Sequence, residues 1–189
     1  IHVGVTTNGT IMHKYLDICA EKVSWLRVSV DAGSSEVFQE FRPHASGKSQ
    51  FDLVISNMKS FAEKKKGILG YSFLLLSKFD KNGKLLGTNA SDIQKAGILS
   101  KEIGCDYFEV KPAFDLMHYL QHQDNKVTDI TNSQLNAIKD LNSENFKVIA
   151  PYTLEEALKG SAVQPKEYER CLVQEMRTVV SPSGVYVCP

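Results

Sequence analysis

The sequence lacks a surplus of charge and any long apolar run. Lys and Arg together number 22, as do Asp and Glu, so no positive excess is present to bind a phosphate backbone or an anionic membrane. No apolar stretch approaches the roughly 20 residues that span a bilayer, and the N-terminus lacks the residue order of a signal peptide. We therefore expect a cytoplasmic protein that binds neither nucleic acid nor membranes.

Cysteine is scarce, and an N-terminal Met is absent. The four cysteines are Cys19, Cys105, Cys171 and Cys188, and in the cytoplasm such residues are thiols or metal ligands before they are disulfides. Cys19 and Cys105 stand beside apolar residues and are predicted to be small buried side chains. The chain starts directly in an apolar run and stops just after a strand-like segment, so we expect both ends to be cuts through a larger protein.

What is present is the composition of a globular domain. The chain of 189 residues is 42% hydrophobic and 23% charged, which suffices for one substantial core. Short β-branched runs alternate with segments of helical period, a pattern typical of βα units around a parallel sheet. Strands are predicted near residues 2–6, 25–30, 68–76, 107–110 and 146–150.

The intervening segments predict helices. An apolar stripe over residues 51–62 has the spacing of a helix that packs on a sheet. Ser91 is predicted to cap a helix that runs to Ile103, with Gly104 as its left-handed terminating residue. Thr131 or Ser133 is predicted to open another helix. The units differ in length and show no repeat, which favours an open or closed βα barrel over a solenoid.

The pattern changes near Tyr152. A short helix over residues 153–158 is followed by a polar loop, by Cys171 and by a predicted hairpin around residues 181–184, where Pro and Gly are turn formers. We therefore divide the chain into residues 1–151, a barrel portion, and residues 152–189, the start of a second module.

In such barrels the active site lies at the carboxyl ends of the strands. Ser29 and Asp31 either hold a ribose or an ammonium group or cap the helix that follows, and Asn8 is either a site residue or part of a turn. Arg42 is either solvated or a clamp for a carboxylate. Lys111, followed by Pro112, could form a Schiff base if desolvation lowers its pKa.

Taken together, these strand exits resemble the radical S-adenosylmethionine superfamily with a C-terminal auxiliary region of the SPASM or twitch kind. The matching segments are Thr7-Asn8-Gly9, Ser29-Val30-Asp31-Ala32-Gly33, Arg42, the helix with Phe51, Asp52, Val54, Ile55 and Asn57, Gly104-Cys105-Asp106-Tyr107, and Val110-Lys111-Pro112. The resemblance implies an α/β fold, a partial βα barrel followed by a small cysteine-containing domain.

The resemblance also implies an activity and a set of roles. In such enzymes a 4Fe-4S cluster reduces S-adenosylmethionine, and the resulting radical abstracts hydrogen from a peptide, protein, sugar or other small substrate. Asn8 would contact the cofactor, Ser29 and Asp31 its ribose or methionyl part, and Arg42 its methionyl carboxylate. Lys111 and Pro112 would lie near the adenine. Flavodoxin or ferredoxin would supply electrons.

Two features concern iron. Cys171 and Cys188 resemble the first ligands of an auxiliary cluster, since thiolates suit iron-sulfur ligation, although three residues separate Gly184 from Cys188 where the family pattern usually has four. The defining Cys-x3-Cys-x2-Cys motif is absent from these 189 residues, so we expect it to precede Ile1 in the parent enzyme and this piece alone to be inactive. The alternatives are a Schiff-base lyase that uses Lys111 and a non-catalytic βα scaffold.

Overall fold

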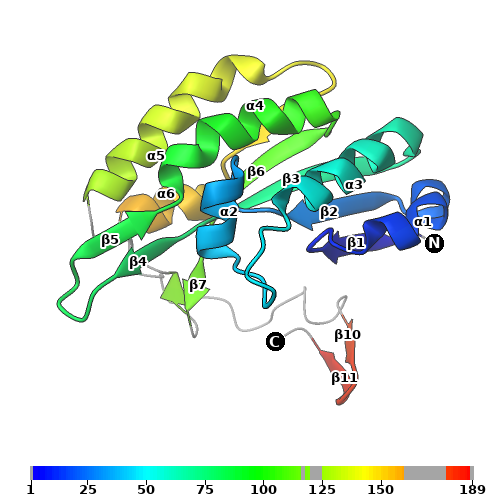
Figure 1. Cartoon of the computed structure of the whole chain (residues 1–189), viewed down its shortest axis with the longest axis horizontal. Helices are drawn as coiled ribbons and strands as arrows, with labels where there is room; N and C mark the ends of the chain where they lie inside the picture. The colour runs from blue at the N-terminus through cyan, green and yellow to red at the C-terminus, as the bar shows by residue number, and fades with distance from the viewer. Residues whose placement is uncertain (1, 116–117, 120–124, 160–177, 188–189) are drawn as a thin grey trace, which may run out of the picture.

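The computed structural model describes residues 2–115, 118–119, 125–159 and 178–187. Its centre is a five-stranded sheet in the order β1-β2-β3-β6-β9 (Figure 1). All four pairings within this sheet are parallel. The strands are β1 (Gly4–Thr7), β2 (Trp25–Ser29), β3 (Ile68–Leu75), β6 (Tyr107–Pro112) and β9 (Lys147–Ile149). All five strands predicted from the sequence are confirmed, with ends that move by one or two residues.

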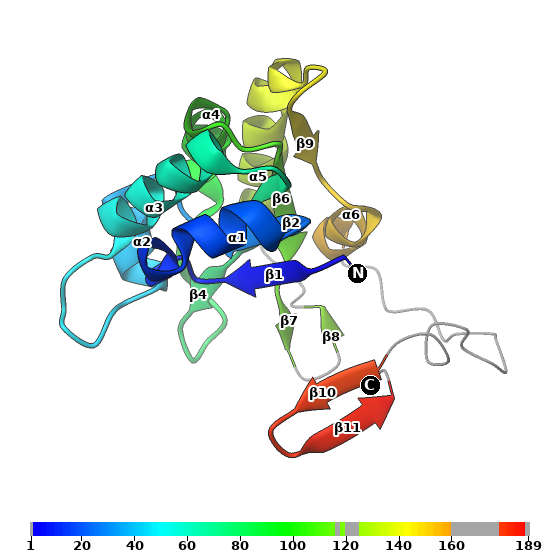
Figure 2. The same ribbon diagram turned by 90° about the vertical axis from the view of Figure 1, so that its right-hand side faces the viewer.

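Helices follow the strands, and a layer of them covers one face of the sheet. They are α1 (Leu16–Lys22), α2 (Ser35–Phe41), α3 (Phe51–Lys64), α4 (Ile93–Ile103), α5 (Asn125–Ile138) and α6 (Tyr152–Lys159). Three short 3-10 helices, η1 (Met12–Lys14), η2 (Ala90–Asp92) and η3 (Lys139–Leu141), lie in the connections. Figures 1 and 2 show α1, α3, α4 and α5 side by side on the same face. The result is a series of βα units, as the alternating pattern predicts.

The core lies between this helical layer and the sheet. Alternate residues of the three central strands point into it, and Val54, Met58, Phe61 and Ile93 meet them from α3 and α4. The buried strand residues are Leu26, Val28, Leu69, Tyr71, Phe73, Leu75, Phe108 and Val110. The rings of Tyr71 and Phe108 pack edge to face with centroids 5.7 Å apart. Burial of each such side chain stabilises the fold by about 1.5–3 kcal/mol.

The predicted helix over residues 51–62 is confirmed by α3. Gly104 is confirmed as the left-handed residue that ends α4, with φ of 93°. The prediction that Ser91 caps α4 is wrong. Ser91 lies exposed inside η2, and the N-cap position of α4 is Asp92.

The predicted start of the next helix at Thr131 or Ser133 is also wrong. α5 begins at Asn125 and contains both residues. Thr131 is fully buried, and its hydroxyl donates to the Val127 carbonyl over 2.7 Å. A threonine satisfied in this way sits inside a helix instead of capping it.

The segment after residue 151 contains a helix and a hairpin. α6 confirms the predicted short helix, and it buries Leu154 and Ala157. The predicted hairpin is confirmed by β10 (Thr178–Ser181) and β11 (Gly184–Val187), which pair antiparallel. The division of the chain at residue 151 stays a prediction.

Two smaller hairpins complete the described residues. β4 (Ser77–Phe79) pairs with β5 (Leu85–Thr88), and β7 (Phe114–Asp115) pairs with β8 (His118–Tyr119). Among the helices of the described segments, none combines the length and the apolar character that a membrane span requires.

Candidate functional site

A cavity of about 240 Å³ lies at the carboxyl ends of β1 and β2. Its lining consists of Asn8, Thr10, Ser29, Phe38, Arg42, Pro43, His44 and Gln50. Three of the predicted cofactor-binding residues, Asn8, Ser29 and Arg42, therefore face one cavity although they come from three separate segments. This is the end of a parallel sheet where βα proteins bind their ligands.

The turn after β1 is held rigidly. The Asn8 side-chain carbonyl oxygen accepts hydrogen bonds from the amide and the hydroxyl of Thr10, over 3.2 and 2.9 Å. Gly9 has φ of 80°, and a Cβ there would stand 2.9 Å from Val28 and Val54. Asn57, buried in α3, donates to the Gly9 carbonyl over 2.8 Å. Asn8 thus belongs to a turn and lines the cavity as well.

Asp31 follows β2 and holds Arg42 in place. Its backbone adopts φ of 60°, and the residue is 1% exposed. One carboxylate oxygen accepts from the amide of Leu74 over 2.7 Å, and the other accepts from Arg42 Nε over 2.5 Å and pairs with Nη2. Burial raises the pKa of Asp31, while Arg42 and the Leu74 amide oppose that rise.

The alternative reading of Asp31 as a helix cap is wrong. The N-cap position of α2 is Ser34, whose side chain makes no cap bond. The Asp31 carboxylate is engaged with Leu74 and Arg42. Asp31 therefore contributes to the cavity through Arg42. Placed at the C-terminal end of α2, the Arg42 guanidinium is one-third exposed.

Two residues that the sequence analysis missed support this region. Asn89 is fully buried. It donates to the carbonyl oxygens of Asp31 and Leu74 over 2.9 and 2.8 Å, and it accepts from the amide of Leu76 over 2.8 Å.

Asp92 is also buried. Its carboxylate accepts from the Gly33 amide over 2.6 Å and from the Ser34 hydroxyl over 2.9 Å. The only signal in the sequence is the run Asn89-Ala90-Ser91-Asp92, in which Asn89 and Asp92 stand three positions apart.

Lys111 and Pro112 form the end of β6. Lys111 stands opposite Leu74 in the register, and its Nζ lies 3.4 Å from a carboxylate oxygen of Glu109. Lys111 also lowers the pKa of Asp31 electrostatically. Asp31 follows β2 and Lys111 belongs to β6, so β3 lies between the two charges. Nothing in the described contacts favours the Schiff-base alternative.

The predicted iron ligands cannot be placed. Cys171 and Cys188 both lie outside the described residues. Within the described segments there is no cluster of three or more His, Cys, Asp or Glu side chains that could hold a metal ion. Cys105 is buried, as predicted, and Cys19 is half-buried against the core.

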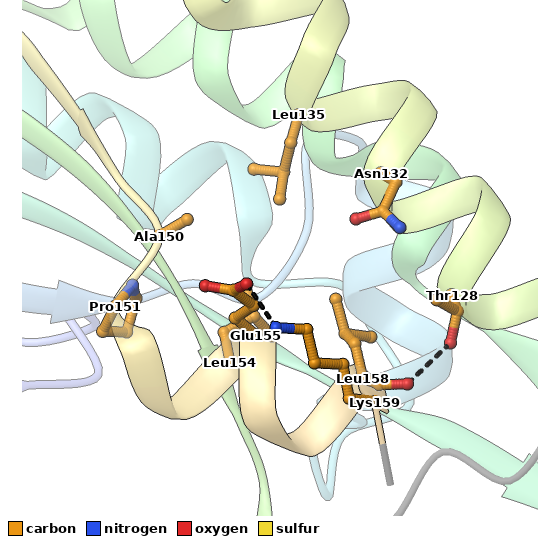
Figure 3. Close-up of a pocket in the computed structure, with 9 residues that line it drawn as sticks. All are labelled: Thr128, Asn132, Leu135, Ala150, Pro151, Leu154, Glu155, Leu158 and Lys159. Atoms are coloured by element: carbon orange, nitrogen blue, oxygen red, sulfur yellow. Dashed lines mark hydrogen bonds and ion pairs between the residues drawn. The ribbon is translucent and has the colours of Figure 1, made fainter. Parts of the chain in front are cut away.

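A second cavity, of about 450 Å³, lies between α5 and α6 (Figure 3). Leu135, Leu154 and Leu158 supply its apolar wall, and Glu155 and Lys159 form an ion pair of 2.6 Å beside it. The Thr128 hydroxyl donates to the Leu158 carbonyl over 3.3 Å and ties the two helices together. None of the predicted site residues lines this cavity.

Comparison with known proteins finds similarity to solved structures and none to family models or curated sequences. No family model and no curated protein matches the chain. A domain of pyruvate-formate lyase-activating enzyme from Bacteroides vulgatus matches with a TM-score of 0.52 and 14% identity, over 80% of this chain and 81% of that one. Streptococcus suis SuiB bound to S-adenosylmethionine matches with a TM-score of 0.54 and 15% identity, over 87% of this chain and 36% of that one.

These matches define the class of fold. The five-stranded α/β structure is similar to the partial barrels of radical S-adenosylmethionine enzymes, as the sequence resemblance implies. The chain spans about a third of SuiB and about four fifths of the domain from B. vulgatus. At these identities the likeness concerns the fold, and function has to be argued from the site.

Proposed function

We propose that this chain is part of a radical S-adenosylmethionine enzyme and that the cavity at the ends of β1 and β2 binds the methionyl part of that cofactor. The observation that carries the proposal is the convergence of Asn8, Ser29 and Arg42 on this cavity. The similarity in fold to SuiB, which was solved with S-adenosylmethionine bound, supports it.

The donors in the cavity suit a carboxylate. A guanidinium has five N–H donors, and the contacts of Arg42 with Asp31 use Nε and Nη2. Arg42 can therefore keep its pairing with Asp31 and still bind the methionyl carboxylate of the cofactor. The Asn8 amide and the Ser29 hydroxyl would add neutral hydrogen bonds.

The size of the cavity limits what it holds. Its volume of about 240 Å³ lies below the roughly 300–1,000 Å³ of sites that enclose drug-sized ligands. We therefore assign the methionyl part to this cavity and the adenine to the ends of β3 and β6, beside Lys111 and Pro112. Asp31 lies between these two regions, since it contacts Arg42 on one side and Leu74 on the other.

Bound S-adenosylmethionine would supply radical hydrogen abstraction once a 4Fe-4S cluster reduces it. The residues of this chain would bind and orient the cofactor and shield it from water. Ligands of the reducing cluster, the auxiliary ligands Cys171 and Cys188, and a flavodoxin or ferredoxin as electron donor belong to the same proposal. The substrate, a peptide, protein, sugar or other small molecule, stays open within it.

Binding can be tested on these 189 residues by nuclear magnetic resonance. We expect S-adenosylmethionine, titrated to millimolar concentration, to shift the backbone amide signals of Gly9, Val30 and Leu74. Leu74 is a sensitive reporter because its amide donates to Asp31. Arg42→Gln should weaken binding at least tenfold, since it removes the charge that meets the carboxylate.

The matched control is Lys81→Gln, a charge removed from the exposed turn between β4 and β5, which should bind like the wild type. Shifts confined to the α5–α6 cavity, or no shift at millimolar cofactor, would reject the assignment. Equal affinity in Arg42→Gln and the wild type would reject the role of Arg42.

A further inference from the structure

The face of the sheet opposite the helices is polar. Figure 2 shows the helical layer on one side of the strands, and alternation along each strand sends every second side chain to the other side. These side chains include Thr6, Arg27, Ser29, Ser72, Tyr107, Glu109 and Lys111, all partly exposed except the buried Ser72 and the exposed Thr6. A face of this composition is suited to a polar ligand.

Two glycines on this face make room for two aromatic rings. A Cβ at Gly4 would stand 2.1 Å from the ring of Trp25, and a Cβ at Gly70 would stand 2.0 Å from the ring of Tyr107. The Trp25 ring therefore lies over β1 and the Tyr107 ring over β3. Arg27, between them on β2, stands opposite Gly70 in the register, and its Cζ is 5.9 Å from the centre of the Trp25 ring.

The hydrogen-bond donors of the Arg27 guanidinium have long contacts or no partner among the described residues. Its Nη2 donates to the Thr6 hydroxyl over 3.5 Å, and its Nη1 lies 3.5 Å from a Glu109 carboxylate oxygen. Charge-assisted hydrogen bonds of this kind are usually about 2.7–2.9 Å long. Nε of Arg27 is buried and has no hydrogen-bond partner among the described residues. A buried donor without a partner is unfavourable, and a ligand that lets the guanidinium reorient would relieve it.

The local charge is positive. Arg27 and Lys111 both approach the same oxygen of Glu109, at 3.5 and 3.4 Å, so two cations share one anion. The Tyr107 hydroxyl is protonated at neutral pH like that of any tyrosine, and it can donate; burial raises its pKa further. The face thus offers one unbalanced positive charge and a neutral donor, a combination that matches a ligand with a single negative charge.

We propose that Arg27, with Tyr107 beside it, forms a binding site for a carboxylate group of a small-molecule or peptide ligand. A carboxylate is planar and fits the fork of a guanidinium through two parallel hydrogen bonds. Without a ligand, the nearest anion to the Arg27 guanidinium is Glu109, at 3.5 Å. The carboxylate of a bound ligand would lie closer to the guanidinium than Glu109 does. Nothing in the cofactor assignment uses Arg27 or Tyr107.

The position of the site suggests the role of its ligand. Arg27 precedes Ser29 by two residues on β2, which places it roughly 7 Å further from the carboxyl end of the strand. A ligand held by its carboxylate at Arg27 would extend towards the end of the sheet where the cofactor is assigned. That this ligand is the substrate rests on the proposed function, whereas carboxylate binding itself does not.

The Nε–H signal of Arg27 gives a direct test. We expect acetate and N-acetylglycine to shift this signal saturably at millimolar concentration, while chloride at equal ionic strength leaves it in place. Arg27→Lys identifies the signal by its loss. Arg27→Gln, followed by the backbone amides, should bind at least tenfold more weakly and Tyr107→Phe several-fold more weakly, and Lys81→Gln should bind like the wild type.

The Glu109→Gln variant distinguishes a loss of carboxylate binding at this site from a general loss of folding. The substitution removes the competing anion, so acetate should bind several-fold more tightly than to the wild type. Weaker binding in Glu109→Gln, a chloride shift equal to that of acetate, or saturation by inorganic phosphate at lower concentration than by either carboxylate would overturn the proposal. Binding of S-adenosylmethionine is measured at the amide signals of Val30 and Leu74, and carboxylate binding is measured at the Arg27 signal. Either of the two proposals can therefore be rejected while the other stands.

Discussion

The side-chain amide of Asn89 donates a hydrogen bond to the main-chain carbonyl oxygen of Asp31 over 2.9 Å, although 58 positions separate the two residues. The same side chain bonds the carbonyl of Leu74 and the amide of Leu76. One buried amide thus fixes the end of β2 against the end of β3. It holds the backbone of Asp31 in the left-handed conformation that brings its carboxylate to Arg42.

Asn89→Ala should therefore destabilise the protein by about 2–4 kcal/mol, because it leaves buried main-chain donors and acceptors without partners. Urea denaturation measures this loss. Asn82→Ala, in the exposed turn between β4 and β5, is the matched control and should change stability by less than about 0.5 kcal/mol. Equal stability of the two variants would mean that Asn89 does not hold the strand ends.

The burial of Asp31 predicts a pH dependence of stability. Burial raises the pKa of Asp31 in the folded state, so between its unfolded and folded pKa values the folded protein binds the proton and the unfolded chain does not. Stability contributed by the neutral form is complete below the unfolded pKa and is lost as the pH rises through the folded pKa.

Asp31→Asn, which cannot ionise, isolates this effect. The free energy of unfolding of the wild type, minus that of Asp31→Asn, should decrease as the pH rises from the unfolded pKa through the folded pKa and then stay constant. Urea titrations at a series of acidic pH values measure it. A difference that increases with pH would mean that Arg42 outweighs burial and lowers the pKa.

The close approach of Tyr107 to Gly70 predicts a strong coupling. Gly70→Ala would place a Cβ 2.0 Å from the Tyr107 ring, so the ring must move, and we expect a loss of about 1–3 kcal/mol. In a Tyr107→Ala background the same substitution should cost little. Gly87→Ala is the control, because the nearest atom to its Cβ is a flexible Glu40 carboxylate oxygen at 3.2 Å. Additive effects of Gly70→Ala and Tyr107→Ala would contradict the contact.

The sheet could be predicted from the sequence because each strand is a short β-branched run between segments of helical period. The first residues of the helices were harder to predict than the strands. Ser91, Thr131 and Ser133 are all capping residue types, but the structure places Ser91 inside η2 and both Thr131 and Ser133 inside α5. Several residue types open helices equally well, so local sequence alone leaves the start uncertain.

The candidate site was predictable in part. Asn8, Ser29 and Arg42 could be named because they follow strands or a short helix, and strand ends meet at one edge of a parallel sheet. Asn89 could not be named, since its partners at Asp31 and Leu74 come from distant parts of the chain. The same holds for Arg27, whose significance depends on two glycines on neighbouring strands that admit aromatic rings.

The two described cysteines should differ sharply in reactivity. Cys105 is 4% exposed and burial raises the pKa of its thiol, whereas Cys19 is half-buried. Alkylation requires a thiolate that the reagent can reach, so Cys105 should react only after the fold opens. With iodoacetamide at about pH 8, modification of Cys105 should be at least ~100-fold slower than that of Cys19 in the native protein. Mass spectrometry of the two peptides measures both rates, and the unfolded chain in concentrated urea is the control, in which the rates should converge. Similar rates in the native protein would show that the layer of α3 and α4 over β3 and β6 opens far more readily than its packing indicates.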